Sequence, residues 1–403
     1  MIYIDNNATT AVAPEVFDAV KPFLTSEYFN PSSLYEPAES VQKILTAARG
    51  RVAANLGCEP REILFTSCAT ESNNAAIFGA AAANPKRKQI ITTTVEHPAV
   101  LEVCRELARR GYTVAEIPVD KAGNLDLAEF ARAVTPGETL LVSVMHANNE
   151  TGVIFPIERL ARLVKQIDPE IIFHTDATQS VTKIPIDLAG NFSQVDLLSF
   201  SGHKIHAPKG VGVLYIRRGT PLRPFLFGGH QESGRRGGTE NVPYIVGIAK
   251  AMDLAAATHE EDIARIERLR NRLEEGITAQ IPYIEVNGKG APRMPNTLNI
   301  ACHAIEGEGI LYSLNEYKIC ASSGSACTSG SLDPSHVLSA MQVPFTAIHG
   351  SVRFSLSRYT TEEEIDRILE VFPGIVSNLR SMSPYWNKEK NEPVAFTNWA
   401  QKN

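Results

Sequence analysis

The stretch "VDLLSFSGHKIHAPKGVGVLYI", Val195–Ile216, joins two apolar, β-rich runs through a short polar turn. Lys204 stands just past the end of the first run, next to His203. A lysine directly after an apolar strand is unusual, because its ammonium group loses hydration in a partly buried cleft. The same desolvation lowers the pKa of a lysine and makes it a usable nucleophile or base. The stretch therefore predicts two strands with a reactive amine between them.

Similar apolar runs recur from about Glu62 to Arg217 and alternate with helix-like segments. The seven strand candidates are "EILFTS", "QIITTTV", "TVAEIPV", "LLVSVMH", "IIFHTD", "VDLLSFS" and "GVGVLYI". Apolar strands that alternate with helices predict an α/β fold with a mainly parallel sheet covered on both faces. Ligands bind such sheets beyond the carboxyl ends of the strands, so the residues that follow each run are the candidates for function.

Polar residues follow several of these runs. A helix is expected to begin at Ala69 and Thr70, His97 follows the second run, and Asp176 and Gln179 follow the fifth. Taken singly, each has an ordinary explanation, such as a helix cap, a structural histidine or an Asx turn. Taken together, a helix N-terminus for a phosphate, a carboxylate for a pyridinium N–H and a lysine for a Schiff base predict a pyridoxal 5′-phosphate site.

The pattern changes beyond Thr258. Apolar residues from Ile263 to Ile277 repeat at helical spacing, and "TTEEEIDRILEVFPGIV" starts with a capping box. Between them lies "SSGSACTSGS", Ser322–Ser331, a run of small polar residues around Cys327. We expect a second, smaller α+β domain that carries Cys327 on a flexible loop.

The composition excludes several classes of function. The net charge of −6 and the lack of a Lys/Arg block argue against nucleic-acid binding. No apolar run is long enough to cross a bilayer, and the N-terminus does not resemble a secretory signal. The six cysteines form no C-x-x-C pair, which argues against a disulfide framework or a zinc site and favours a reducing cytoplasm.

With these motifs in view, the chain resembles the cysteine desulfurases of the NifS/IscS type, in the class V aminotransferase-like superfamily. The resemblance runs from "YIDNNATT" to "SPYW" and includes "CATESNN", "VEHPAV", "HANNETG", "TDATQS", "SFSGHKIHAPKGVG", "GGTENV", "SSGSACTSGSLDPSHVL" and "SVRFSLSR". It implies the aspartate aminotransferase-like fold type I, with a seven-stranded sheet in a large domain of residues 15–258. Residues 1–14 and 259–403 would form the small domain, whose mobile catalytic loop spans about residues 321–333.

The resemblance also implies roles for individual residues. Lys204 would carry the cofactor and move the Cα proton, His97 would stack on the cofactor ring and handle protons, and Cys327 would take the sulfur. The implied cofactor contacts are Ala69, Thr70, Asn149, Asp176, Gln179, Ser201, His203, Lys204 and, reaching into the neighbouring subunit of a homodimer, Thr239. Asn149 and Arg353 would receive the substrate carboxylate, since a guanidinium grips a carboxylate through parallel hydrogen bonds.

The implied reaction converts L-cysteine into L-alanine and leaves a persulfide on Cys327. A mobile loop would then carry the sulfur to an acceptor outside the cleft. The length of the loop resembles that of relatives that donate sulfur to iron–sulfur scaffold proteins. We expect no resident metal, although Cys327 could contact an iron–sulfur cluster transiently.

Other functions stay open at this point. A selenocysteine lyase or an aminotransferase for small amino acids would share the fold, and a non-catalytic scaffold that binds a partner belongs to another class. A metal site at His203, His206 and Cys327 is a further alternative, although its spacing suits zinc only weakly. The sequence does not distinguish a role dedicated to nitrogenase from general iron–sulfur assembly.

Overall fold

The computed structural model describes residues 1–323 and 334–394, so Cys327 and most of its loop lie outside the described residues. A seven-stranded sheet forms its centre, in the order β2-β8-β7-β6-β5-β3-β4. β8 runs antiparallel to its two neighbours and the other strands run parallel to one another, which confirms the predicted, mainly parallel α/β sheet. The strands are β2 (Ile63–Thr66), β3 (Gln89–Thr93), β4 (Thr113–Ile117), β5 (Thr139–Ser143), β6 (Ile172–Asp176), β7 (Leu197–Ser201) and β8 (Gly212–Ile216).

Helices cover both faces of this sheet, because its strands are apolar on both sides. On one face, α4 (Ala69–Ala83) and α5 (Pro98–Arg109) pack on Leu64, Leu141 and Leu197. On the other face, further helices pack on Phe65, Val142 and Phe200. These helices are α1 (Pro14–Val20), α3 (Glu36–Leu56), α6 (Leu127–Ala133), α7 (Ile157–Ile167) and α8 (Val242–Ala257). The short helix α2 (Pro22–Thr25) and the 3-10 turns η1 (Pro60–Glu62), η2 (Gly202–Lys204) and η3 (Gln231–Gly234) complete this part.

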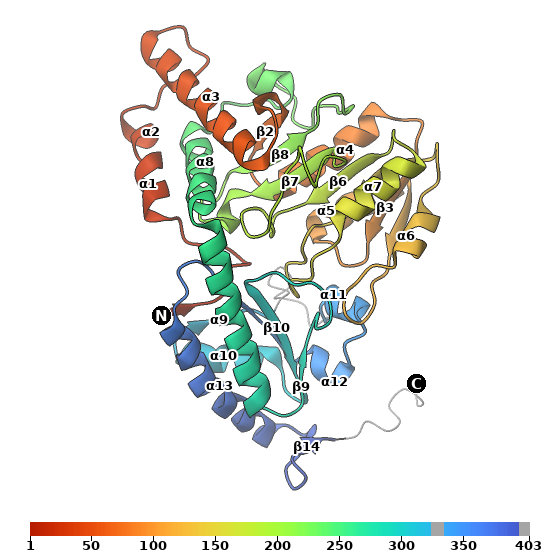
Figure 1. Ribbon diagram of the computed structural model, residues 1–403, viewed down its shortest axis with the longest axis vertical. Helices are drawn as coiled ribbons and strands as arrows, with labels where there is room; N and C mark the ends of the chain where they lie inside the picture. Colours follow the sequence, from red (N-terminus) through yellow and green to blue (C-terminus); the bar gives the residue numbers. More distant parts are fainter. Residues whose placement is uncertain (324–333, 395–403) are drawn as a thin grey trace.

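A second hydrophobic core lies below the large sheet in Figure 1, where α9 (His259–Gln280) runs alongside β10. It joins Ile4 to apolar residues from Ile266 to Val376. This core contains a three-stranded sheet with the strand order β12-β10-β9. Its elements are β9 (Ile284–Val286), β10 (Thr297–Cys302), α10 (Gly307–Glu316), β12 (Ser351–Ser355) and α13 (Glu362–Met382). The predicted helix around Ile263 to Ile277 and the capping box at Thr361 are both confirmed.

We propose the two-domain division that the sequence predicts, with residues 15–258 in one domain and residues 1–14 and 259–403 in the other. The separate cores support it. One element crosses this division, because α11 (His336–Ala340) contributes Val337 to the large core. The remaining short elements are β1 (Ile2–Tyr3), β11 (Ile319–Cys320), α12 (Phe345–Ile348), β13 (Trp386–Asn387) and β14 (Glu392–Pro393).

The N-terminal segment links the two cores and passes beside η2, the turn that carries Lys204. Strand β1 pairs with β11, and Ile4 is buried in the second core. A few residues later, the Thr10 N–H donates to the His203 carbonyl at 2.9 Å, and Ala13 packs in the large core. The turn after β7 therefore has a neighbour some two hundred positions away in the sequence. Among the described residues, no helix is both long and apolar enough to span a membrane.

Candidate active site

A cavity of about 310 Å³ lies where the carboxyl ends of the parallel strands meet the N-terminal segment. The lining includes every predicted site residue except Thr239 and Cys327. Those residues are Ala69, Thr70, His97, Asn149, Asp176, Gln179, Ser201, His203, Lys204 and Arg353. Thr239 lies elsewhere and is exposed, and Cys327 lies outside the described residues. Folding thus gathers residues from six separate loops and strands into one pocket.

Lys204 stands at the end of η2, directly after β7. Its Nζ donates to the carbonyl of Asn7 at 2.6 Å and to that of Ala8 at 2.8 Å. Both acceptors belong to the N-terminal segment. The Lys204 amine therefore lies at the junction of the two cores.

Asp176 ends β6 and is 6% exposed. Its carboxylate accepts hydrogen bonds from the Asn73 side-chain amide at 2.7 Å and from the Thr178 N–H at 2.9 Å. Within the described parts of the chain it forms no ion pair. A buried carboxylate held by neutral donors is suited to receive a cationic N–H, such as that of a pyridinium ring.

Another part of the cavity lining suits an anion. Helix α4 starts at Ala69, and no side chain caps its first N–H groups. Ser201 Oγ is buried without a hydrogen-bond partner among the described residues, which fits a phosphate oxygen that would accept from it. Gly212 allows the helix start to lie this close, since a Cβ there would come within 2.6 Å of the Cys68 backbone.

Two histidines line the cavity in neutral form. Burial, followed by the charge of Lys204, lowers the pKa of His203 to about 4. Burial also lowers the pKa of His97, whose Nδ1 accepts from the Ala99 N–H at 3.0 Å. That bond assigns the His97 proton to Nε2. A neutral, planar imidazole fits the role of stacking on a ring and exchanging protons.

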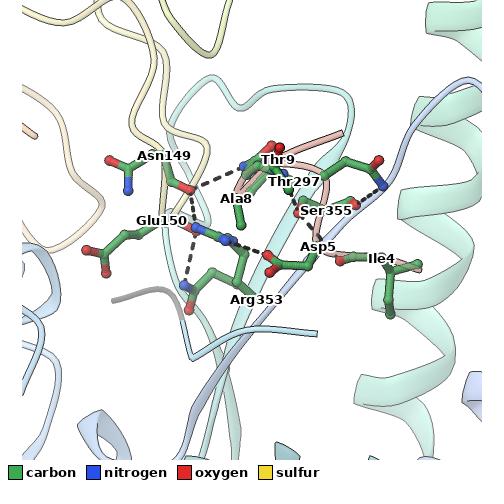
Figure 2. Close-up of polar contacts among 12 residues, drawn as sticks. Ile4, Asp5, Ala8, Thr9, Asn149, Glu150, Thr297, Arg353 and Ser355 are labelled. Atoms are coloured by element: carbon green, nitrogen blue, oxygen red, sulfur yellow. Dashed lines mark hydrogen bonds and ion pairs between the residues drawn. The ribbon is translucent and has the colours of Figure 1, made fainter. Parts of the chain in front are cut away.

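Arg353 and Asn149, the two residues that we expect to receive the substrate carboxylate, both line the cavity and contact each other (Figure 2). Arg353 is 2% exposed, and its Nη1 donates to the Asn149 carbonyl at 2.9 Å. Its Nη2 also forms an ion pair with Asp5 at 2.6 Å. The buried guanidinium is therefore oriented by residues from two distant segments before any substrate enters.

Several residues of this site were not predicted from the sequence. Asn73 holds Asp176, Asp5 holds Arg353, and the Asn7 carbonyl accepts from both Lys204 and the Gln179 amide. Asn73 and Asp5 stand inside the motifs "CATESNN" and "YIDNNATT". The position of Asn73 one helical turn after Ala69 was the available signal, because residues four apart share a helix face. Nothing local predicted the contact between Asp5 and Arg353.

Among the described residues, no group of histidine, cysteine, aspartate and glutamate could hold a metal ion. The donor set of the cavity fits an organic phosphate instead. A lysine, a buried carboxylate, a helix start and a neutral imidazole around one pocket define, with this α/β fold, a pyridoxal 5′-phosphate-dependent enzyme of fold type I.

Comparison with known proteins identifies the family. The profile of Aminotransferase class-V matches residues 2–368. A cysteine desulfurase of Trichormus azollae is 56% identical over 389 residues, which cover 96% of each chain. Cysteine desulfurase NifS of Azotobacter vinelandii is 56% identical over 394 residues, covering 98% of this chain and 96% of that one. A solved structure of a NifS-like protein has a TM-score of 0.88 and 40% identity, and the match covers 94% of this chain and 100% of that one.

The chain belongs to the class V aminotransferases and, within them, to the cysteine desulfurases. It is thus a pyridoxal 5′-phosphate enzyme that takes cysteine as substrate and transfers its sulfur. The comparisons favour none of the alternatives, neither a selenocysteine lyase, an aminotransferase nor a non-catalytic scaffold.

Proposed function

We propose that the cavity beside Lys204 is the desulfurase active site, with the residue roles that the sequence predicts. Lys204 would bind the cofactor covalently, Asp176 would pair with its ring nitrogen, and Gln179 with its ring oxygen. The phosphate would lie against Ala69, Thr70, Ser201 and His203. When bound, pyridoxal 5′-phosphate supplies an electron sink for the Cα of the substrate. The observation that carries the proposal is the shared cavity, whose lining offers a buried hydroxyl for a phosphate and a buried carboxylate for a pyridinium N–H.

The protein supplies the remaining chemistry. Arg353 and Asn149 would hold the substrate carboxylate, and the Lys204 amine would then remove the Cα proton. Neutral His97 has its N–H on Nε2, available as a proton donor near the ring. The walls of the cavity keep these groups partly away from water, which strengthens each electrostatic contact.

Replacing Arg353 with lysine tests the carboxylate site. We expect KM for L-cysteine to rise about 10- to 100-fold, with a smaller change in kcat, because lysine keeps the charge but loses the paired hydrogen bonds of the guanidinium. Retaining the charge also keeps Asp5 from being left unpaired. Steady-state assays of alanine formation measure the effect, and Arg367→Lys, an exposed arginine on α13, is the control. An unchanged KM would remove Arg353 from the substrate site.

We propose further that Cys327 accepts the sulfur. Its thiolate would attack the substrate sulfur, so that a new S–S bond forms as the substrate Cβ–S bond breaks. The electron pair of the broken bond stays with the carbon skeleton, which takes up protons and leaves as L-alanine. Incubation with L-cysteine should add one sulfur atom to the peptide that contains Cys327, in step with alanine release. Alanine without added mass on that peptide would contradict the proposal.

The next proposal is a homodimer in which Thr239 reaches the phosphate of the partner's cofactor. Thr239 is exposed, and Phe227, on the loop before it, is 85% exposed. Apolar side chains of this size are candidates for burial against a second copy of the chain.

Mixed dimers test this arrangement. A Lys204→Ala chain and a Thr239→Glu chain should each be poorly active alone. Combined, they should regain about half of the wild-type activity per mixed dimer, because one site then has both Lys204 and the Thr239 of the other chain. Copurification through two different affinity tags, one on each chain, confirms that the mixed dimers form. If they form without regained activity, Thr239 does not act across the interface.

We also propose that an iron–sulfur scaffold protein receives the sulfur and that the enzyme works in the cytoplasm. The described cysteines, Cys58, Cys68, Cys104, Cys302 and Cys320, are free thiols, which is consistent with a reducing compartment. Labelled sulfur from cysteine should pass from the enzyme to a purified scaffold protein.

A further inference from the structure

A second lysine lies beside the site, and no proposed step uses it. Lys183 follows β6 and the turn that carries Gln179, and it is half-buried. Its Nζ donates to Gln179 Oε1 at 3.4 Å. The amide nitrogen of Gln179 donates in turn to the Asn7 carbonyl at 3.0 Å, the same oxygen that accepts from Lys204 at 2.6 Å. One short chain of hydrogen bonds thus connects the two lysines.

The two lysines also share a cavity. A space of about 60 Å³ behind the main pocket is lined by Lys183 and Lys204, together with residues of α9 and the segment after β12. Lys204 lines both cavities, and Lys183 lines only the smaller one. The charge of Lys183 can therefore act on Lys204 across the small cavity, while Lys183 itself does not line the main pocket.

Among the described residues, no carboxylate acts on the charge of Lys183. Burial lowers its pKa to about 7, and the charges of Lys204 and Arg353 lower it as well. Among the described lining residues of the small cavity, Asp262 is the one carboxylate, and it forms an ion pair with Arg358 at 2.8 Å. The histidines of this lining, His206 and His259, bring no negative charge. A buried ammonium without a counter-ion is costly, and an apolar side chain would fill the space without that cost.

We propose that Lys183 is a positioning residue of the desulfurase: it fixes the Gln179 amide as a donor toward the cofactor and keeps the Lys204 amine in its reactive, uncharged form. This inference rests on the proposed role of Lys204. With Oε1 of Gln179 bound to Lys183, the amide nitrogen must face Asn7 and the main pocket. A nearby positive charge also disfavours a second ammonium group, so more of Lys204 stays neutral and able to react.

The test measures how fast the full-length apo-protein captures pyridoxal 5′-phosphate at different pH values. Visible absorbance is the readout of capture. For Lys183→Met we expect capture about tenfold slower at pH 6.5, since a shift of one pKa unit changes the neutral fraction tenfold. At pH 8.5, Lys183 has lost its charge in the wild type. The capture rates of the wild type and Lys183→Met should therefore agree within about twofold. Lys183→Arg keeps the charge at both pH values and should capture at least as fast as the wild type.

Lys209→Met is the matched control, because Lys209 is exposed, and its charge acts on His203 but not on Lys183. It should change the rate less than about twofold at either pH. If the wild type captures the cofactor at Lys204 and Lys183→Met captures it equally fast at pH 6.5, this inference is wrong. The proposed role of Lys204 would still stand in that case. Capture that persists in Lys204→Ala would instead overturn the proposed role of Lys204.

A reciprocal measurement covers the case in which Lys183→Met does not fold. The pKa of Lys183, measured by NMR on protein with labelled lysine, should be higher in Lys204→Ala than in the wild type, because one neighbouring positive charge is gone. An unchanged pKa of Lys183 would show that the two amines do not interact, and would contradict the proposal.

Discussion

Replacing Lys204 with alanine should abolish both the covalent bond to the cofactor and the release of alanine from cysteine. We expect turnover to fall by at least about four orders of magnitude, because one side chain supplies both the covalent attachment and the proton transfer at Cα. The visible absorbance of the loaded enzyme should change at the same time. Fold and cavity should survive, since the Asn7 and Ala8 carbonyls that accept from Lys204 belong to a segment that Ile4 and Ala13 also hold in the two cores.

Lys209→Ala is the control for this experiment, as an exposed lysine in the same loop. It should retain the visible band and activity within about twofold of the wild type. If Lys204→Ala kept a reducible covalent bond to the cofactor, another amine would be the attachment site. Lys183 would be the first to examine, because it lies in the adjoining cavity.

The second large effect is expected at Cys327. Cys327→Ser should lower sulfur release by at least about 100-fold, because a serine hydroxyl is not ionised near neutral pH and does not accept sulfur. Cofactor binding and the spectral change on adding cysteine should persist, since these steps belong to the cavity around Lys204. Rapid mixing would show the spectral change, and sulfide and alanine assays would show the loss of turnover.

Cys320→Ser is the matched control, because Cys320 is a free thiol seven positions before Cys327 in the sequence. It should leave sulfur release within about twofold of the wild type. Normal sulfide release by Cys327→Ser would show that sulfur leaves the substrate without a protein thiol. A loss that appeared equally in Cys320→Ser would point to damage of the loop rather than to a missing nucleophile.

Much of the large sheet could be predicted from local patterns. Each of the seven apolar runs became a strand, with ends that differ from the predicted ones by a few residues. "LLVSVMH", for example, stops being a strand at Ser143, and Val144 onward turns toward the site. A strand ends where its hydrogen bonds to the neighbouring strand end. The sequence of one apolar run does not contain that information.

The direction of β8 shows the same limit. The run "GVGVLYI" predicted a strand, but its antiparallel pairing with β2 and β7 depends on the short turn that holds Lys204. A turn of this length cannot form the crossover that a parallel neighbour needs. The chain must therefore reverse, and the reversal leaves Lys204 at the edge where the other strands end.

By itself, the sequence determined the main strands and helices and the α/β class, and it predicted which lysine, cysteine and acid react. These depend on the period of apolar residues and on side-chain chemistry, both of which are local. The tertiary structure alone decided that Asp5 orients Arg353, that the Asn7 carbonyl accepts from Lys204 and that Lys183 lies behind it. Such contacts join segments up to 348 positions apart. They exist only after two cores have packed on one another, because the free energy that holds them comes from burial rather than from any neighbouring residue.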